Sequence, residues 1–111
     1  MTQQDPATAG YVFNQTMLRI RDPDASLAFY QSVLGMTLYQ RVDFAEMSFS
    51  LYFLGYPTNH ADKPLPTEPT DRSRLTFRQS ALLALTHNWG TESDQTFEGY
   101  HSGNADPRGF G

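Results

Sequence analysis

The amino-acid sequence predicts an α+β module, in which a curved, mixed four-stranded sheet carries a helix on one face. Apolar and polar residues alternate along 11–21, as in a strand with one buried face. Residues 22–35 carry apolar side chains at helical spacing between a capping residue and a glycine. Residues 36–44 and 47–56 have the composition of strands, and 81–88 begin as a short apolar strand.

The first strand separates two faces of different chemistry. Because successive side chains of a strand point to opposite faces, Gln15, Met17 and Arg19 share a face that carries functional groups. We expect the helix to cover the opposite face, which comprises Thr16, Leu18 and Ile20.

The helix has recognisable start and stop signals. Asp22 is a favourable N-cap, and Pro23 fits the first helical position, where a backbone N–H has no helical partner. Gly35 fits the left-handed residue that often ends a helix. The predicted buried stripe comprises Leu27, Tyr30, Val33 and Leu34.

The later strands continue the same two faces. Strand alternation places Phe49, Leu51 and Phe53 on one face and Ser50, Tyr52 and Leu54 on the other. If the last strand turns its even positions inward, the polar face also carries Ala84, Thr86 and Asn88. Prolines without periodicity predict a loop over 57–71, and 72–80 fit no single element.

The composition excludes several function classes. A net charge of -4 disfavours nucleic acid and anionic membranes as partners. The chain has 0 cysteines, which excludes disulfides and thiolate metal sites and favours a cytoplasmic location. We expect residues 1–10 to be a flexible leader, because they lack the basic and apolar stretches of a signal peptide.

Several residues allow a functional and a structural interpretation. A mid-strand arginine such as Arg19 needs either an internal carboxylate, which the residues alone slightly favour, or an anionic ligand. His87 points away from the polar face, so satisfaction by nearby backbone groups is favoured over metal ligation; His60 and His101 lie in loops. Four apolar residues are interpreted first as core residues and second as walls of an apolar pocket: Phe44, Met47, Leu51 and Phe53.

Three segments resemble glyoxalase I, the lactoylglutathione lyase family of the vicinal oxygen chelate superfamily. They are "QTMLRIRDPDASLAFYQSVLGMTLYQRVDFAEMSFSLYFLGY" (15–56), "LTHNWGTE" (85–92) and "GYHSGNADPRGFG" (99–111). The family pairs two βαβββ modules into a cup that holds a zinc or nickel ion. The resemblance implies that 11–111 is an incomplete glyoxalase domain, the first module with its connecting loop. It also implies methylglyoxal detoxification, in which the hemithioacetal of methylglyoxal and glutathione isomerises to S-lactoylglutathione.

The resemblance assigns roles to individual residues. Gln15 matches the first metal ligand, and Arg19, Asn88 and Arg108 match contacts to glutathione. The apolar pocket for the thiol substituent matches Phe44, Met47, Leu51 and Phe53.

Ala84 stands where the family has its second metal ligand, a glutamate. The chain also stops at Gly111, before the other two ligands of the family. We therefore expect the chain alone to be inactive and not to retain the divalent metal, as a fragment that needs a second module or a homodimer. The alternatives are a non-catalytic small-ligand binding module of the same superfamily, acting as a dimer, and a half-domain that does not fold stably.

Overall fold

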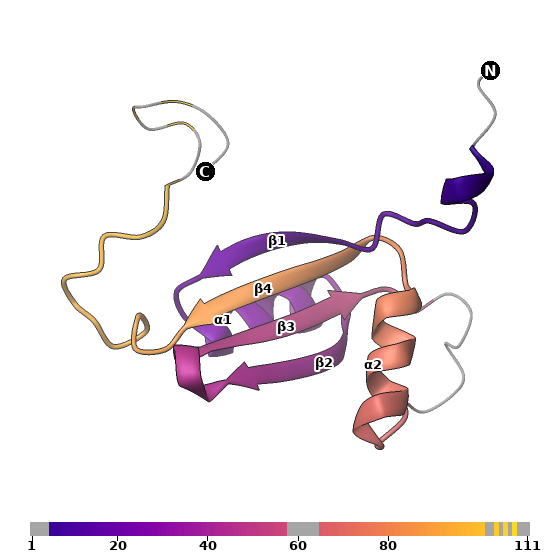
Figure 1. Ribbon diagram of the computed structural model, residues 1–111. Helices are drawn as coiled ribbons and strands as arrows, with labels where there is room; N and C mark the ends of the chain where they lie inside the picture. The colour runs from indigo at the N-terminus through magenta and orange to yellow at the C-terminus, as the bar shows by residue number, and fades with distance from the viewer. Residues whose placement is uncertain (1–4, 58–64, 102–103, 105, 107, 109–111) are drawn as a thin grey trace.

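The computed structural model describes residues 5–57, 65–101, 104, 106 and 108. Its elements follow the predicted order, with one additional helix before the last strand (Figure 1). They are the turn η1 (Pro6–Thr8), β1 (Gln15–Ile20), α1 (Pro23–Leu27), the turn η2 (Ala28–Val33), β2 (Thr37–Phe44), the turn η3 (Ala45–Met47), β3 (Phe49–Gly55), α2 (Pro69–Arg78) and β4 (Leu82–Asn88).

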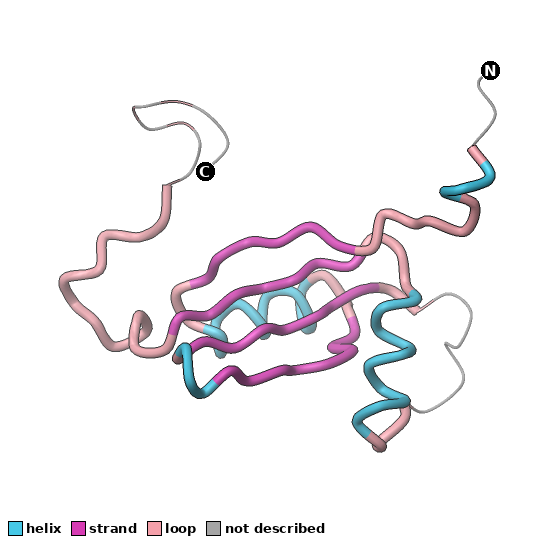
Figure 2. Tube along the Cα trace, in the orientation of Figure 1, coloured by secondary structure: helices cyan, strands magenta, loops and turns pink. Residues whose placement is uncertain are grey.

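The four strands form one mixed sheet in the order β1-β4-β3-β2. β1 runs parallel to β4, whereas β3 is antiparallel to both β4 and β2. Figure 2 shows α1 behind the sheet and α2 at one end of it. The α+β class and the mixed four-stranded sheet that the sequence predicts are therefore confirmed.

The first helix begins as predicted and then departs from regular α-helix. The Asp22 carboxylate accepts a hydrogen bond from the backbone N–H of Asp24, and Pro23 occupies the first turn. From Ala28 to Val33 the backbone widens into a π-helical turn, in which the N–H of Leu34 bonds the carbonyl of Phe29 at 3.1 Å. Gly35 has the expected left-handed conformation, with φ of 69°.

The wider turn changes which side chains face the sheet. Leu27 and Tyr30 pack against the core, as predicted. The prediction that Val33 and Leu34 are buried is wrong, because they are 69% and 44% exposed. A π turn takes more residues per turn than an α turn, so the regular 3.6-residue spacing no longer describes this face.

The sheet buries side chains on both faces. The helix-covered face has a core of Ile20, Tyr52, Leu54 and Leu85, against which α1 and η2 pack. The opposite face has a second core of Tyr39, Phe53, Leu82 and Ala84. A register shift between Leu38 and Gln40 in β2 marks an irregularity at Tyr39.

The additional helix α2 covers one end of this second face. The prediction of a loop through Asp71 is wrong at its end, because α2 begins at Pro69 and is capped by the Glu68 carboxylate, which accepts from two backbone N–H groups. Leu75 packs against the second core, and the Phe77 ring meets the Phe53 ring edge-on at 5.3 Å.

The N-terminal segment carries one short turn, η1, capped by the Asp5 side chain. The leader assignment for 1–10 stays a prediction, and residues 1–4 lie outside the described residues. Among the described helices, none has the length and apolar character that a membrane crossing requires.

Candidate functional site

The sheet face opposite α1 brings the predicted polar residues together; we call it the cup face. Met17 pairs in register with Ala84, and Arg19 pairs with Thr86. β3 adds Leu51 opposite Thr86 and Phe49 opposite Asn88. The register thus places the odd positions of β1 and the even positions of β4 on one face, which is the condition that the sequence alone left open.

Arg19 is the charged group of this face. Its side chain is exposed, and its register partner on β4 is a threonine. Within the described part of the chain, no carboxylate forms an ion pair with Arg19. These residues therefore include no internal carboxylate partner for Arg19, and its guanidinium is available to an anion.

Asn88 lies at the exposed end of β4, two positions beyond Thr86 on the same face. Its side-chain Nδ2 donates a hydrogen bond of 3.0 Å to the Tyr100 hydroxyl. The next residue, Trp89, is fixed from two sides. Its indole N–H donates to the Ser50 hydroxyl at 2.8 Å, and its backbone N–H donates to the Ser48 carbonyl at 2.9 Å.

Ala84 belongs to the buried, apolar end of the cup face. It is 2% exposed and packs in one cluster with Tyr39, Phe53 and Leu82. Gln15, on the neighbouring strand, offers one exposed amide oxygen.

The donor set does not fit a divalent metal. In the residues that the structure describes, no three His, Cys, Asp or Glu side chains gather where they could hold a metal ion. Zinc in proteins takes about four nitrogen, sulfur or oxygen ligands. Gln15, whose register partner is Leu82, supplies one neutral oxygen, and Ala84, which pairs with Met17, supplies none. These residues alone therefore do not form such a site.

The predicted apolar pocket residues differ in their surroundings. The Phe44 ring stacks on Phe49 with centroids 4.7 Å apart, and Leu51 is partly buried beside the second core. Phe53 is buried beneath Phe77, whereas Met47 is exposed in η3. That these residues form the walls of a ligand pocket stays a prediction.

His87 points to the helix-covered side, as predicted, and is buried. Its Nε2 lies 2.6 Å from Oε2 of Glu92, so its partner is a carboxylate rather than backbone. The Glu92 pKa is lowered by its own backbone N–H and by the His87 side chain.

Two of the three remaining candidate residues, Arg108 and His101, are among the described residues. Among the described residues, no hydrogen bond or ion pair joins exposed Arg108 to this face. His101 is exposed, and His60 lies outside the described residues.

A polar chain that the sequence pattern did not indicate crosses the ends of three strands. The buried Ser50 hydroxyl accepts from Trp89 and donates to Asp43 at 2.6 Å, and Arg41 also bonds Asp43, at 2.9 Å. The hydrogen bonds from Ser50 and Arg41 lower the pKa of the Asp43 carboxyl. Although Ser50 pairs in register with His87, its hydroxyl is inaccessible and serves Asp43, so this row does not form a nucleophilic triad.

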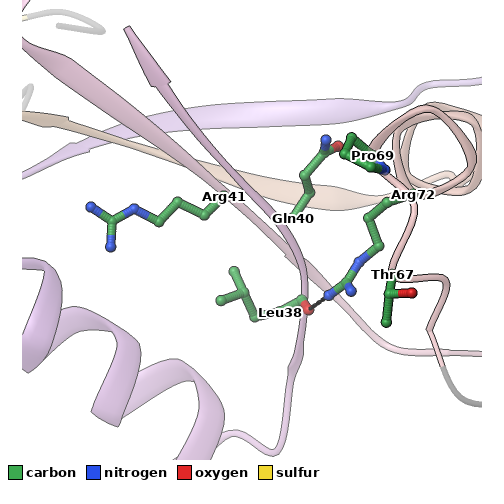
Figure 3. A pocket seen from close by; sticks show the side chains of 6 residues that line it. All are labelled: Leu38, Gln40, Arg41, Thr67, Pro69 and Arg72. Atoms are coloured by element: carbon green, nitrogen blue, oxygen red, sulfur yellow. Dashed lines mark hydrogen bonds between the residues drawn. The ribbon is translucent and has the colours of Figure 1, made fainter. Parts of the chain in front are cut away.

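A shallow pocket of about 330 Å³ lies between β2 and the start of α2, away from Arg19 and Asn88; its lining comprises Leu38, Gln40, Arg41, Thr67, Pro69 and Arg72. Figure 3 shows Arg72 reaching from α2 toward Leu38, with Arg41 directed away. The Arg72 guanidinium donates to the backbone carbonyls of Leu38, Tyr39 and Pro66. We therefore interpret Arg72 as a clamp that holds α2 on the sheet.

The chain has relatives among known proteins. Residues 12–110 match the family model of the Glyoxalase/Bleomycin resistance protein/Dioxygenase superfamily. A protein of Pseudomonas aeruginosa named lactoylglutathione lyase is 51% identical over 109 residues, covering 98% of this chain and 59% of that protein. A protein of Saccharomyces cerevisiae named glyoxalase I is 43% identical over 104 residues, covering 94% of this chain and 28% of that protein.

Among solved structures, the trypanothione-dependent glyoxalase I of Leishmania major aligns with a TM-score of 0.51 and 32% identity. The alignment covers 79% of this chain and 50% of that chain. The present chain thus spans between about a quarter and three-fifths of the length of these relatives. The relatives named lactoylglutathione lyase and glyoxalase I confirm the resemblance to glyoxalase I. The chain belongs to the Glyoxalase/Bleomycin resistance protein/Dioxygenase superfamily.

Proposed function

We propose that residues 11–111 form the first module of a lactoylglutathione lyase and that the cup face binds the glutathione part of its hemithioacetal substrate. The observation that supports this most is Arg19. It is an exposed guanidinium on a strand face, without a carboxylate partner among the described residues and on the same face as Asn88.

The proposed roles follow from the chemistry of each group. The planar guanidinium of Arg19 can donate two parallel hydrogen bonds to one carboxylate, which suits the terminal carboxylates of glutathione. The Asn88 amide supplies a donor and an acceptor for a peptide or carboxylate group. Arg108 is a further glutathione contact in this proposal, and the substituent on the thiol meets Phe44, Met47, Leu51 and Phe53.

The isomerisation step requires more than this module offers. The family reaction uses zinc or nickel, and Gln15 is the residue proposed to contribute a ligand here. Because Ala84 supplies neither a ligand nor a proton acceptor, we propose that the module binds the substrate but does not isomerise it unaided. A second module or a second copy of the chain is the proposed partner, in a cytoplasmic setting.

The test is a titration of the chain with S-hexylglutathione, which carries both the peptide and an apolar thiol substituent. Trp89 is the chain's 1 tryptophan and adjoins Asn88, so its fluorescence reports on this end of the face. Arg19→Gln should weaken binding about tenfold or more, since truncating one partner of a charged pair costs about 2 kcal/mol.

Arg74→Gln is the matched control, because Arg74 is also an exposed arginine but lies on α2, where it pairs with Asp71. It should bind as the unmodified chain does. If the unmodified chain fails to bind, or if both variants lose binding equally, the cup face is not the glutathione site.

A second candidate function is favoured by Ala84, whose apolar neighbours suit a face that binds a small ligand without metal. In this alternative the chain is a non-catalytic binding module that acts as a dimer. Elemental analysis after incubation with zinc and nickel and desalting, together with light scattering, separates the candidates. A metal-free dimer supports the binding module, whereas stoichiometric metal shows that a site is rebuilt between copies.

A further inference from the structure

The segment after β4 folds back onto the corner between β1 and α1; we call residues 91–100 the return segment. Arg21, directly after β1, holds it through two backbone carbonyls. The Arg21 Nε donates to Thr91 at 3.1 Å, and Nη2 donates to Asp94 at 3.0 Å. The Thr91 hydroxyl donates in turn to the Arg21 carbonyl at 2.6 Å. Two distant parts of the chain are thus joined reciprocally.

The return segment continues to Asn88 through two aromatic rings. The Arg21 guanidinium lies 5.8 Å from the centre of the Phe97 ring. Phe97 meets Tyr100 edge-on, with the centroids 5.0 Å apart. The Tyr100 hydroxyl then accepts the 3.0 Å hydrogen bond from Asn88. The segment therefore leaves the sheet after Asn88 and returns a hydroxyl to that same side chain.

An exposed asparagine at a strand end has a broad distribution of side-chain torsions. A ligand that uses such an amide must order it on binding, and this ordering weakens the affinity. In the free protein, Tyr100 accepts a hydrogen bond from one N–H of the Asn88 side-chain amide. The second N–H and the side-chain oxygen of that amide are left for a ligand.

We propose that Tyr100 is a positioning residue for Asn88 and that Arg21 keeps Tyr100 in place through the return segment. This inference rests on the proposed function, because it assigns Asn88 to ligand binding. The competing explanation is purely structural, with Asn88 and Tyr100 only holding the return segment together. The two differ in what removal of the Tyr100 hydroxyl does to binding.

Tyr100→Phe removes the hydroxyl and keeps the ring that contacts Phe97. Binding of S-hexylglutathione, measured by calorimetry on the full chain, should weaken about three- to tenfold, as expected for one hydrogen bond. Tyr11→Phe is the matched control, since Tyr11 is 74% exposed and distant in sequence, and it should leave the affinity unchanged. In an Asn88→Ala background, Tyr100→Phe should have no additional effect, because the two residues act through one contact.

A second readout needs no ligand. The side-chain NH₂ signals of Asn88, assigned by their loss in Asn88→Ala, should shift in Tyr100→Phe. Arg21→Lys should move them in the same direction, since lysine keeps the charge but lacks the fork that bonds two carbonyls.

The outcomes separate this inference from the proposed function. If the unmodified chain binds and Tyr100→Phe binds equally well, the positioning role is wrong and the proposed function stands. If Tyr100→Phe weakens binding equally with or without Asn88, the effect does not pass through Asn88 and the inference is overturned. If the unmodified chain does not bind, the proposed function fails and this inference fails with it.

Discussion

Replacement of Ala84 by glutamate tests whether this position, where the resemblance to glyoxalase I leads us to expect a metal ligand, belongs to an apolar core. Ala84 is 2% exposed, against Tyr39, Phe53 and Leu82. The larger side chain must displace these neighbours, which typically costs about 1–3 kcal/mol. Met17, its neighbour on β1, is 40% exposed, so the new carboxyl group has a partial route to water.

The ionised form adds a second cost that depends on pH. With that partial route to water, we expect burial to raise the pKa of the new carboxyl by about 2 units in the folded chain, below the maximum seen for fully buried groups. Two units correspond to about 2.7 kcal/mol. Since the folded pKa exceeds the unfolded value of about 4.3, this cost is absent below pH 4 and grows as the pH rises to the folded pKa.

Ala84→Gln is the matched control, because it adds nearly the same volume without a titrating group. Urea unfolding, followed by Trp89 fluorescence and circular dichroism at pH 4.0 and pH 7.5, measures both variants. We expect equal stability at the lower pH and a deficit of about 3 kcal/mol for Ala84→Glu at the higher pH. Equal stability of the two variants at both values would show that position 84 is hydrated and would refute the reasoning.

Two further predictions concern contacts outside the cup face. Arg72→Met should lower the free energy of unfolding in urea by about 2 kcal/mol, because it removes the hydrogen-bond donors to backbone carbonyls beside the irregularity in β2. Arg74→Met, the control at an exposed position, should change it by less than about 0.5 kcal/mol. Asp43→Asn should make the stability of the fold less sensitive to acid. The pKa of the Asp43 carboxyl is lowered in the folded chain, so the ionised group stabilises the fold above its unfolded pKa of about 3.9. This contribution is lost as the pH falls through the folded pKa. Thermal melts from pH 6 to pH 2.5 measure this, and parallel curves for the two chains would contradict it.

The cup face could be predicted because strand alternation is a local property. Once β1 and β4 are recognised as strands, their period of two places Arg19 and Asn88 on defined faces. What alternation leaves open is which faces meet. The parallel register, with Arg19 beside Thr86, is set by contacts between distant segments.

The helix α2 could not be predicted in the same way. It follows a proline-rich stretch, and its cap, Glu68, is not among the usual capping residues. Pro69 at the first helical position was the local signal available, because proline is favoured there. The stabilising contacts are distant in sequence: Arg72 bonds carbonyls of β2, and Phe77 packs on Phe53.

The π-helical turn escaped prediction for a different reason. Val33 and Leu34 have apolar side chains at regular helical spacing, and that spacing correctly places Leu27 and Tyr30. The hydrogen bond from Leu34 to Phe29 widens the last turn, and the residues beyond it rotate away from the sheet.

The two ends of the cup face have different chemistry, and this bears on why alanine stands at position 84, where the resemblance leads us to expect a glutamate. Arg19, Thr86 and Asn88 lie toward the C-terminal ends of β1 and β4, whereas Ala84 lies under the part of the face that α2 covers. A carboxylate in that apolar surrounding destabilises the fold unless a cation compensates it, because an unpaired buried charge is costly. Without such a cation, alanine at position 84 is therefore the residue that folding stability favours. In the proposed function, Arg19 and Asn88 bind the anionic peptide, so the binding of glutathione does not require a carboxylate at position 84.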